Sequence, residues 1–311
     1  MRERQTIRIA TRGSRLALWQ ATHVKARLLE LWPELAIELV IIKTLGDRIL
    51  DAPLAKLGGK GLFIKELEQA LLDGAADLAV HSMKDVPVEL PSALHIPTVL
   101  PRDDPRDCLV APRYGQIDAL PPGAIIGTSS LRRRSQLLAR RPDLDLRDLR
   151  GNVTTRLAKL TKGEFDGIVL AAAGLRRLDM AAQITEYLAP NDMLPAIGQG
   201  VIGVECRQDD RVIEEILAPL NDPITGDALA AERALNAALH GGCQVPIAGH
   251  ATVTGDTVHL AGLVASLDGR TQVRAAQTGT RRHAAALGTA VGEALLAAGA
   301  DRILGALGTP Q

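Results

Sequence analysis

The chain alternates short β-rich segments with amphipathic helical segments, and this alternation limits the possible folds most strongly. Residues 7–11 read as a strand, and residues 16–32 carry apolar side chains at helical spacing. The pattern continues with expected strands at 35–43, 78–81, 108–111, 125–128, 166–172 and 201–206, and with a helix at 62–72. Such βα units predict a mostly parallel sheet that is covered by helices, which is an α/β fold.

Two clusters of proline and glycine interrupt this pattern. Proline density rises at Pro97, Pro101 and Pro105, and the segment LPAIGQG occupies residues 194–200. From about residue 222 an Ala-rich helix precedes antiparallel-looking strands at 258–264 and 271–277. We therefore predict a first domain of residues 1–100 with 201–218, a second of 101–200, and a C-terminal α+β domain of 219–311, with hinges near 97–106 and 194–200.

Composition excludes several classes of function. The 36 basic and 36 acidic residues give a net charge of zero, and Trp, Tyr and Phe occur only twice each, which argues against nucleic-acid binding. The charged N-terminal segment and the lack of a long apolar run predict a cytoplasmic protein that does not span a membrane. Three cysteines without C-x-x-C spacing argue against a disulfide framework or a thiolate metal site, so we expect no bound metal.

The segment AIIGTSSLRRRSQLL leads from a strand into a helix and is a candidate anion site. Thr128, Ser129 and Ser130 can cap the helix, whose first N–H groups are free to bind an anion. Arg132 and Arg133 follow in the first turns, where the helix dipole disfavours positive charge by roughly 0.3 to 1 kcal/mol each unless an anion is bound. The alternative is a solvated basic face.

Similar arginine-bearing turns occur elsewhere in the chain. Arg12 and Ser14 lie where a strand gives way to a helix, and Arg150 and Arg156 flank another turn. The carboxyl ends of parallel strands are where such folds bind ligands, and guanidinium groups suit carboxylate or phosphate. Together these turns predict a ligand with several anionic groups, with scattered surface arginines as the alternative.

The segment HSMKDVP places Lys84 and Asp85 directly after an expected strand. An ionised Asp85 could stabilise a cationic intermediate or act as an acid-base group, although such a pair can also be a surface ion pair. We interpret His81 as a strand residue with a satisfied hydrogen bond and not as a metal ligand.

Glycine-rich loops provide the remaining candidates. The segment HGGCQVP can display Cys243 from a loop, whereas Cys108 and Cys206 read as small core residues. The loop LGGKGLF is not a phosphate P-loop, because Lys60 is followed by glycine, and it reads instead as a mobile cover over a cleft. The match GQGVIG at 198–203 precedes a strand instead of following one, which excludes a dinucleotide site.

Taken together, these segments resemble the porphobilinogen deaminase family, whose members are also called hydroxymethylbilane synthases. The resemblance rests on the segments IATRGSRLALWQA, PLAKLGGKGLFIKELE, DLAVHSMKDVP, DPRDCLV, GTSSLRRRSQL, LRGNVTTRLAKL, AAAGLRRL, LPAIGQG and GGCQVPI, which occur in the family's order as far as about residue 251. It implies two domains like those of periplasmic binding proteins around a cleft, with a smaller third domain that carries the cysteine loop.

The resemblance also implies an activity. The enzyme would be a transferase that joins four porphobilinogen molecules head to tail with loss of ammonia, and then hydrolyses the product to hydroxymethylbilane in porphyrin and haem biosynthesis. Its partners would be porphobilinogen and the growing polypyrrole chain, and we expect a monomer. Porphobilinogen carries acetate and propionate groups, which fit the ligand inferred from the arginine turns.

The resemblance further implies site roles. Cys243 would bear a covalent dipyrromethane cofactor through a thioether, and Asp85 would stabilise the positive azafulvene-like intermediates. Lys60 and Phe63 would belong to a mobile lid. The residues expected to bind cofactor or substrate carboxylates are Arg12, Ser14, Lys84, Thr128, Ser129, Ser130, Arg132, Arg133, Arg150, Arg156 and Arg177.

Two other classes remain as alternatives. A non-catalytic anion-binding protein could use the same two-domain architecture, but it would need neither Cys243 nor Asp85. A nucleic-acid binder could use the cluster from Arg132 to Arg134. The zero net charge and the few aromatic residues argue against this alternative.

Overall fold

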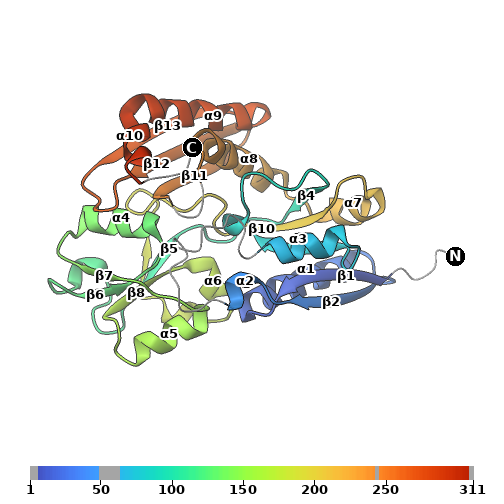
Figure 1. The fold of residues 1–311 in the computed structure, drawn as a ribbon, viewed down its shortest axis with the longest axis horizontal. Coiled ribbons are helices and arrows are strands. Elements are labelled where there is room, and N and C mark those ends of the chain that lie inside the picture. The colour runs from blue at the N-terminus through green and yellow to red at the C-terminus, as the bar shows by residue number, and fades with distance from the viewer. Residues whose placement is uncertain (1–5, 49–63, 242–244, 308–311) are drawn as a thin grey trace. The chain divides into compact units, whose positions relative to one another are not determined.

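The computed structural model describes residues 6–48, 64–241 and 245–307 (Figure 1). The chain divides into two compact units. The first contains residues 1–102 and 201–226, and the second contains residues 103–200 and 227–311.

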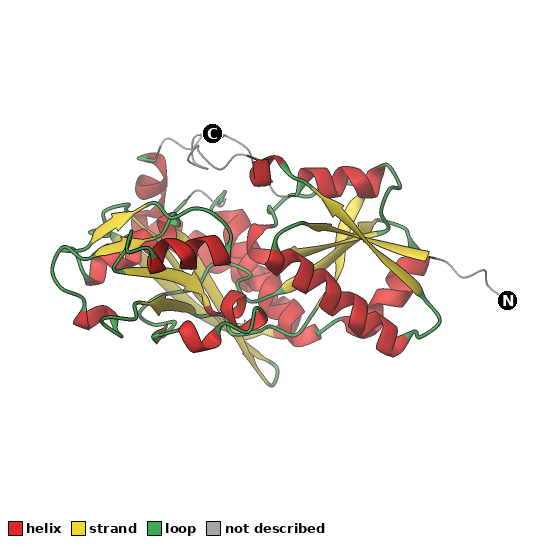
Figure 2. Ribbon diagram, turned by 90° about the horizontal axis from the view of Figure 1, so that it is seen from below, coloured by secondary structure: helices red, strands yellow, loops and turns green. Residues whose placement is uncertain are grey.

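The first unit is built on a mixed five-stranded sheet with the strand order β2-β1-β3-β10-β4. The strands are β1 (Thr6–Arg12), β2 (Ala36–Ile42), β3 (Leu78–Ser82), β4 (Leu94–Val99) and β10 (Ile202–Arg207). Their helices are α1 (Arg15–Leu31), α2 (Leu45–Arg48), α3 (Lys65–Leu72) and α7 (Arg211–Leu217). Figure 2 shows this twisted sheet as crossing arrows with helices on both sides.

Helix α1 illustrates why these elements form. Its buried residues recur every three or four positions and include Ala17, Ala21, Val24 and Leu28, which gives one apolar face toward the sheet. Pro33 follows the last turn and cannot continue the helix, which therefore ends before it.

The second unit contains a second mixed sheet, with the strand order β7-β6-β8-β5-β9. Its strands are β5 (Asp107–Val110), β6 (Ile125–Gly127), β7 (Asp145–Arg147), β8 (Gly167–Ala171) and β9 (Glu186–Leu188). Helices α4 (Leu131–Arg140), α5 (Val153–Thr161) and α6 (Ala172–Arg177) connect them. Strand β5 is fully buried, so its acidic first residue lies in the interior.

The same unit also contains an antiparallel three-stranded sheet, β11-β12-β13. The strands are β11 (Ile247–Thr254), β12 (Thr257–Ala265) and β13 (Gln272–Thr280), and the accompanying helices are α8 (Pro223–Ala238), α9 (Ala284–Leu295) and α10 (Asp301–Gly305). Leu235, Val291 and Leu295 are fully buried in its core. This sheet and its helices form the smaller C-terminal α+β part of the chain.

The α/β fold class is confirmed, and most of the expected strands and helices are present. The expectation of mostly parallel sheets was wrong in one respect. In the first sheet β10 runs antiparallel to β3 and β4, and in the second β5 runs antiparallel to β8 and β9. The domain boundaries and hinges predicted from the sequence remain a prediction.

The proline-rich segment also contains a strand that the sequence pattern did not predict. Strand β4 includes Pro97 and lies at the edge of its sheet, where a residue without a backbone N–H is tolerated. Within the described ranges, no helix has the length and apolar character needed to cross a membrane.

Candidate active site

Two neighbouring strands of the first unit end at a common small cavity. β1 and β3 pair in parallel, so their carboxyl ends lie at the same edge of the sheet. β1 ends at Arg12, while β3 leads into a 3₁₀ turn, Met83–Asp85. The cavity of about 30 Å³ is lined by Arg12, Ala17, Gln20, Ile64, Val80, His81, Ser82 and Asp85. The structure therefore brings together Arg12 and Asp85, which the sequence analysis placed in two separate motifs.

The lining also includes polar residues that were not predicted as site residues. Gln20 donates from Nε2 to Ser82 Oγ at 2.8 Å and is only 3% exposed. The sequence does contain a signal for Gln20 as a site residue, because this polar residue interrupts the buried apolar face of α1. A buried polar side chain needs a partner, and here that partner borders a cavity.

Ser14 and Lys84 lie near these strand ends but are not among the residues that line the cavity. Ser14 is the N-cap of α1, and its Oγ accepts a hydrogen bond from the N–H of Ala17 at 3.3 Å. Lys84 is half-buried in the turn that contains Asp85. Ser14 therefore orients α1 against the end of β1.

A glycine on β10 positions the turn that carries Asp85. Gly203 faces Met83, and a Cβ on Gly203 would collide with the Met83 Sδ atom. The backbone N–H of Met83 also donates to the carbonyl of Val201 at 3.0 Å. The close packing of Met83 on β10 thus fixes the start of the 3₁₀ turn.

The second set of predicted residues lies in the second unit, between β6 and α4. Ser130 is the N-cap of α4 and accepts from the N–H of Arg133 at 3.4 Å. Thr128 is buried and accepts from the N–H of Ser130 at 3.3 Å. Ser129 Oγ donates to the carbonyl of Leu149 at 3.0 Å. The three hydroxyl residues therefore form the turn and cap that were expected.

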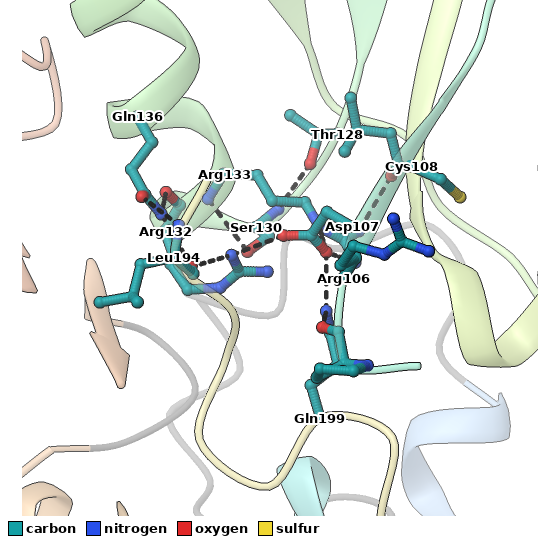
Figure 3. A network of polar contacts seen from close by, with 12 residues as sticks. Arg106, Asp107, Cys108, Thr128, Ser130, Arg132, Arg133, Gln136, Leu194 and Gln199 are labelled. Carbon is teal, nitrogen blue, oxygen red and sulfur yellow. Dashed lines mark hydrogen bonds and ion pairs between the residues drawn. The ribbon is translucent and has the colours of Figure 1, made fainter. Parts of the chain in front are cut away.

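Asp107 holds the two arginines of α4 from the start of β5 (Figure 3). Its carboxylate lies 2.7 Å from Arg132 Nη1 and 2.8 Å from Arg133 Nη2, and it also accepts from Arg133 Nε at 3.0 Å. Gln199 Nε2 donates to the same carboxylate at 3.0 Å. Asp107 is fully buried, and Arg132 and Arg133 are 5% and 6% exposed.

This network changes the interpretation of the two arginines. From the sequence we expect a bound anion to offset their charge at the start of the helix, but the chain itself supplies a carboxylate. Burial disfavours the charged form of Asp107, and the two guanidiniums overcome this effect and hold its pKa far below the ordinary value. Nothing in the spacing of the residues marked Asp107 as their partner.

The two guanidiniums differ in the donors they have left. Arg133 uses its third nitrogen, Nη1, to donate to the carbonyl of Val169 at 2.9 Å. Arg132 uses only Nη1, which donates to Asp107 and to the carbonyl of Leu194 at 2.7 Å. Among the described residues, Nε and Nη2 of Arg132 have no hydrogen-bond partner. Arg132 thus retains donors for an anionic ligand.

The remaining arginines lie around α5 and α6. Arg150 is half-buried, and no described residue bonds its side chain. Arg156 donates from Nε to the carbonyl of Gly151 at 2.8 Å, within the turn before α5. Arg177 is buried and donates from Nη2 to the carbonyl of Gly200 at 2.6 Å, and burial lowers its pKa.

Some predicted residues cannot be placed. Lys60, Phe63 and Cys243 lie outside the described residues, so their expected roles remain predictions. The other two cysteines, Cys108 and Cys206, are fully buried as expected. Burial raises the pKa of each thiol to about 12, which leaves both unreactive at neutral pH. In the part of the chain that the structure describes, no group of three or more potential ligands could hold a metal ion.

Comparison with known families decides the identity of the chain. Residues 7–215 match the family model described as "Porphobilinogen deaminase, dipyromethane cofactor binding domain", and residues 227–297 match the model of the C-terminal domain. The chain belongs to the porphobilinogen deaminase family. It is 56% identical over 301 residues to the porphobilinogen deaminase of Syntrophotalea carbinolica, covering 97% of this chain and 96% of that protein.

The comparison with solved structures gives matches of low identity and low TM-score to this member of the porphobilinogen deaminase family. The sulphonate-binding protein SsuA of Escherichia coli gives a TM-score of 0.40 at 14% identity, covering 76% of this chain and 70% of that chain. The substrate-binding domain of a putative molybdenum ABC transporter from Clostridium difficile gives a TM-score of 0.43 at 10% identity. This match covers 70% of this chain and 92% of that chain.

Membership in the porphobilinogen deaminase family confirms the expected activity and cofactor. The protein is a transferase that condenses porphobilinogen to hydroxymethylbilane in tetrapyrrole biosynthesis. Its cofactor is dipyrromethane.

Proposed function

We propose that each porphobilinogen unit reacts at the ends of β1 and β3, beside this cavity, with Asp85 stabilising the positive charge that develops as ammonia leaves. The shared lining of Arg12 and Asp85 carries this proposal. A carboxylate fixed by a tight turn needs no reorganisation as charge develops on the pyrrole, which makes it effective in the transition state.

Arg12 supplies the opposite charge in the same cavity. Its guanidinium can form charge-assisted hydrogen bonds with an acetate or propionate group of the substrate. Arg12 would thus bind one of the two carboxylates of porphobilinogen, while Asp85 would face the pyrrole that becomes cationic. Ser14 and Lys84 would complete the carboxylate contacts at these strand ends.

The second unit offers donors that fit a dipyrromethane cofactor, whose side chains are carboxylates. Arg132 keeps Nε and Nη2, and Arg150 keeps its whole guanidinium, without partners among the described residues. We propose that the cofactor and the growing chain are held by Arg132 and Arg150, assisted by Thr128, Ser129, Ser130, Arg133, Arg156 and Arg177. When bound, the cofactor supplies the pyrrole α-carbon from which the chain is extended.

We assign the covalent attachment to Cys243. A thioether forms from a thiolate, and burial keeps Cys108 and Cys206 in the thiol form. Cys243 is the remaining cysteine of the sequence, and it follows two glycines in a segment typical of an exposed loop.

We further propose that the enzyme works as a monomer in the cytoplasm, with porphobilinogen and the growing polypyrrole chain as partners and without nucleic acid. Arg132 and Arg133 bond Asp107 inside the second unit, so they do not form a surface patch for phosphates. Light scattering after size-exclusion chromatography should give a mass near the 33.0 kDa of one chain. A dimer mass, or a shift of labelled DNA on a native gel, would contradict this part of the proposal.

The proposed role of Asp85 is tested by replacing it with asparagine, which keeps the size of the side chain and removes its charge. The matched control is Asp73→Asn, because Asp73 is an exposed carboxylate at the end of α3 in the same unit. Porphobilinogen consumption is measured on protein whose cofactor content has been checked by mass.

We expect Asp85→Asn to lower turnover by about a hundredfold or more, since 1.36 kcal/mol of lost stabilisation is about tenfold in rate. Asp73→Asn should retain the rate of the parent enzyme. Near-normal turnover of fully loaded Asp85→Asn enzyme would mean that the reacting carboxylate lies elsewhere.

A further inference from the structure

His81 and Glu205 form a buried pair at the wall of the cavity that contains Asp85. They lie on β3 and β10, which run antiparallel, and Gly203 is the residue directly opposite His81. The imidazole therefore reaches the diagonal neighbour Glu205, with Nε2 2.8 Å from Oε2. The exposed fraction is 5% for His81 and 0% for Glu205.

The contact with Glu205 determines which nitrogen of His81 is basic. An ionised Glu205 accepts a hydrogen bond from Nε2, and this arrangement leaves the lone pair of the neutral ring on Nδ1. No described residue is a hydrogen-bond partner of Nδ1. His81 is one of the residues that line the cavity together with Arg12 and Asp85. A histidine that is oriented by a buried carboxylate and lies at the wall of the cavity that contains Asp85 has the arrangement of a general base.

We propose that His81 is the proton acceptor in the condensation and takes the proton from the α-carbon of the acceptor pyrrole through Nδ1. This inference rests on the proposed reaction at the Asp85 cavity. In this mechanism Asp85 stabilises the positive charge on the pyrrole, and His81 accepts the proton.

The atoms and charges balance in this step. The C–N bond of the substrate's aminomethyl group breaks, and its electron pair leaves with ammonia. The α-carbon of the acceptor pyrrole then forms a bond to the methylene carbon. The C–H bond at that α-carbon breaks, its electrons restore the aromatic pyrrole, and the proton moves to Nδ1 of His81. The imidazolium passes the proton to the released ammonia, which departs as ammonium, and His81 returns to the neutral form.

Charged and titratable groups lie on every element packed around His81. Glu205 lies on β10, Lys65 and Glu68 on α3, Arg12 on β1, and Lys84 and Asp85 on the turn after β3. Burial, reinforced by Glu205, raises the pKa of Glu68, which is 8% exposed. In the described part of the chain, Oε1 of the buried Glu205 has no hydrogen-bond partner. The hydrogen bond from His81 to Oε2 is therefore the contact that compensates the burial of this carboxyl group.

Two variants and one matched control test the proposal. In His81→Gln the amide nitrogen can replace Nε2 and keep the bond to Glu205, whereas the basic Nδ1 is lost. In Glu205→Gln the negative charge is removed while the size is kept. The control is His95→Gln, because His95 also contacts a glutamate through Nε2, Glu214 at 2.9 Å in the same unit, in a pair that is partly exposed and does not line the cavity.

The assay uses holoenzyme with its cofactor confirmed by mass, and porphobilinogen with hydrogen or deuterium at the free α-carbon. We expect His81→Gln to slow condensation by about a hundredfold or more, within the usual range for a general base. It should also show a primary isotope effect from the second condensation onward, because α-proton removal becomes rate-limiting. His95→Gln should retain the condensation rate of the parent enzyme and should show no added isotope effect.

Glu205→Gln and NMR provide readouts that a purely structural role would not change. Without the nearby negative charge the imidazolium of His81 is less stable, so the acid limb of kcat/KM should move to lower pH. Nitrogen-15 NMR of histidine-labelled holoenzyme should show the proton on Nε2 and the lone pair on Nδ1 of neutral His81, independently of turnover.

A folded, fully loaded His81→Gln enzyme with the parent rate and no isotope effect would overturn the proposal. If His81→Gln does not fold, an unchanged acid limb in Glu205→Gln, or an NMR signal with the proton on Nδ1, has the same consequence. Loss of activity in Asp85→Asn alongside a normal His81→Gln enzyme would refute this inference alone. Failure of the unaltered protein to convert porphobilinogen would instead refute the proposed function.

Discussion

Replacing Asp107 with asparagine removes the carboxylate that the buried guanidiniums of Arg132 and Arg133 share. Asp107 is fully buried and lies 2.7 to 3.0 Å from three arginine nitrogens. Breaking a buried ion pair by removing one partner costs about 3 to 5 kcal/mol, because the other charge stays buried without compensation. The matched control is Asp118→Asn, whose carboxylate is 66% exposed and pairs with Arg140. An exposed pair contributes only about 0.2 to 1 kcal/mol.

The assay must report on the second unit. Both tryptophans, Trp19 and Trp32, belong to the first unit, so their fluorescence would not detect a local loss around Asp107. Native-state hydrogen exchange, followed by mass spectrometry of peptides from β5 and β8, measures opening free energies there. We expect protection in these strands to fall by about 3 to 5 kcal/mol in Asp107→Asn. A loss no greater than in Asp118→Asn would refute the reasoning.

The same variant has a defined pH dependence. The pKa of Asp107 lies far below its ordinary value in the folded protein, so its contribution to stability is fully present above the unfolded pKa of about 3.9. That contribution is lost as the pH falls toward the folded pKa. The stability difference between the parent protein and Asp107→Asn should therefore narrow below about pH 4. A difference that stays constant from neutral pH down to pH 3 would contradict this linkage.

Two further predictions concern the site. Arg132→Leu should reduce the fraction of enzyme that carries the cofactor, because Arg132, unlike Arg133, has donors left for a ligand. Arg147→Leu removes an exposed ion pair and should leave the cofactor content unchanged. Equal cofactor content in both variants would contradict the assignment. Gly203→Ala should displace Met83, because a Cβ at this position collides with the Met83 side chain. The variant should consume porphobilinogen more slowly while circular dichroism shows that it stays folded. An unaltered rate would show that the turn tolerates the shift.

Local signals in the sequence predict much of the fold and part of the site. Ser14 and Ser130 precede helical segments and are the N-caps of α1 and α4. Arg12 and Asp85 each follow an expected strand, and parallel pairing of those strands places them on one cavity. In both cases the deciding interaction lies within a few residues or follows from a general rule of parallel sheets.

The missed features depend on pairing between distant segments. The partner of Arg132 is Asp107, and the partner of His81 is Glu205, which is 124 residues away along the chain. Only the register of β10 on β3 brings Glu205 to His81, and no local pattern encodes that register. The antiparallel direction of β5 and β10 was missed for the same reason, since a strand pattern is identical in both directions.

The most direct test of the account is intact-mass spectrometry of the purified active enzyme, followed by peptide mapping. Cys108 and Cys206 are buried with pKa values raised to about 12, so we expect an adduct of two pyrrole units on the peptide that contains Cys243. Porphobilinogen should then add to this same peptide in successive steps. Fully active enzyme with an unmodified Cys243, or with the adduct on Cys108 or Cys206, would contradict the account.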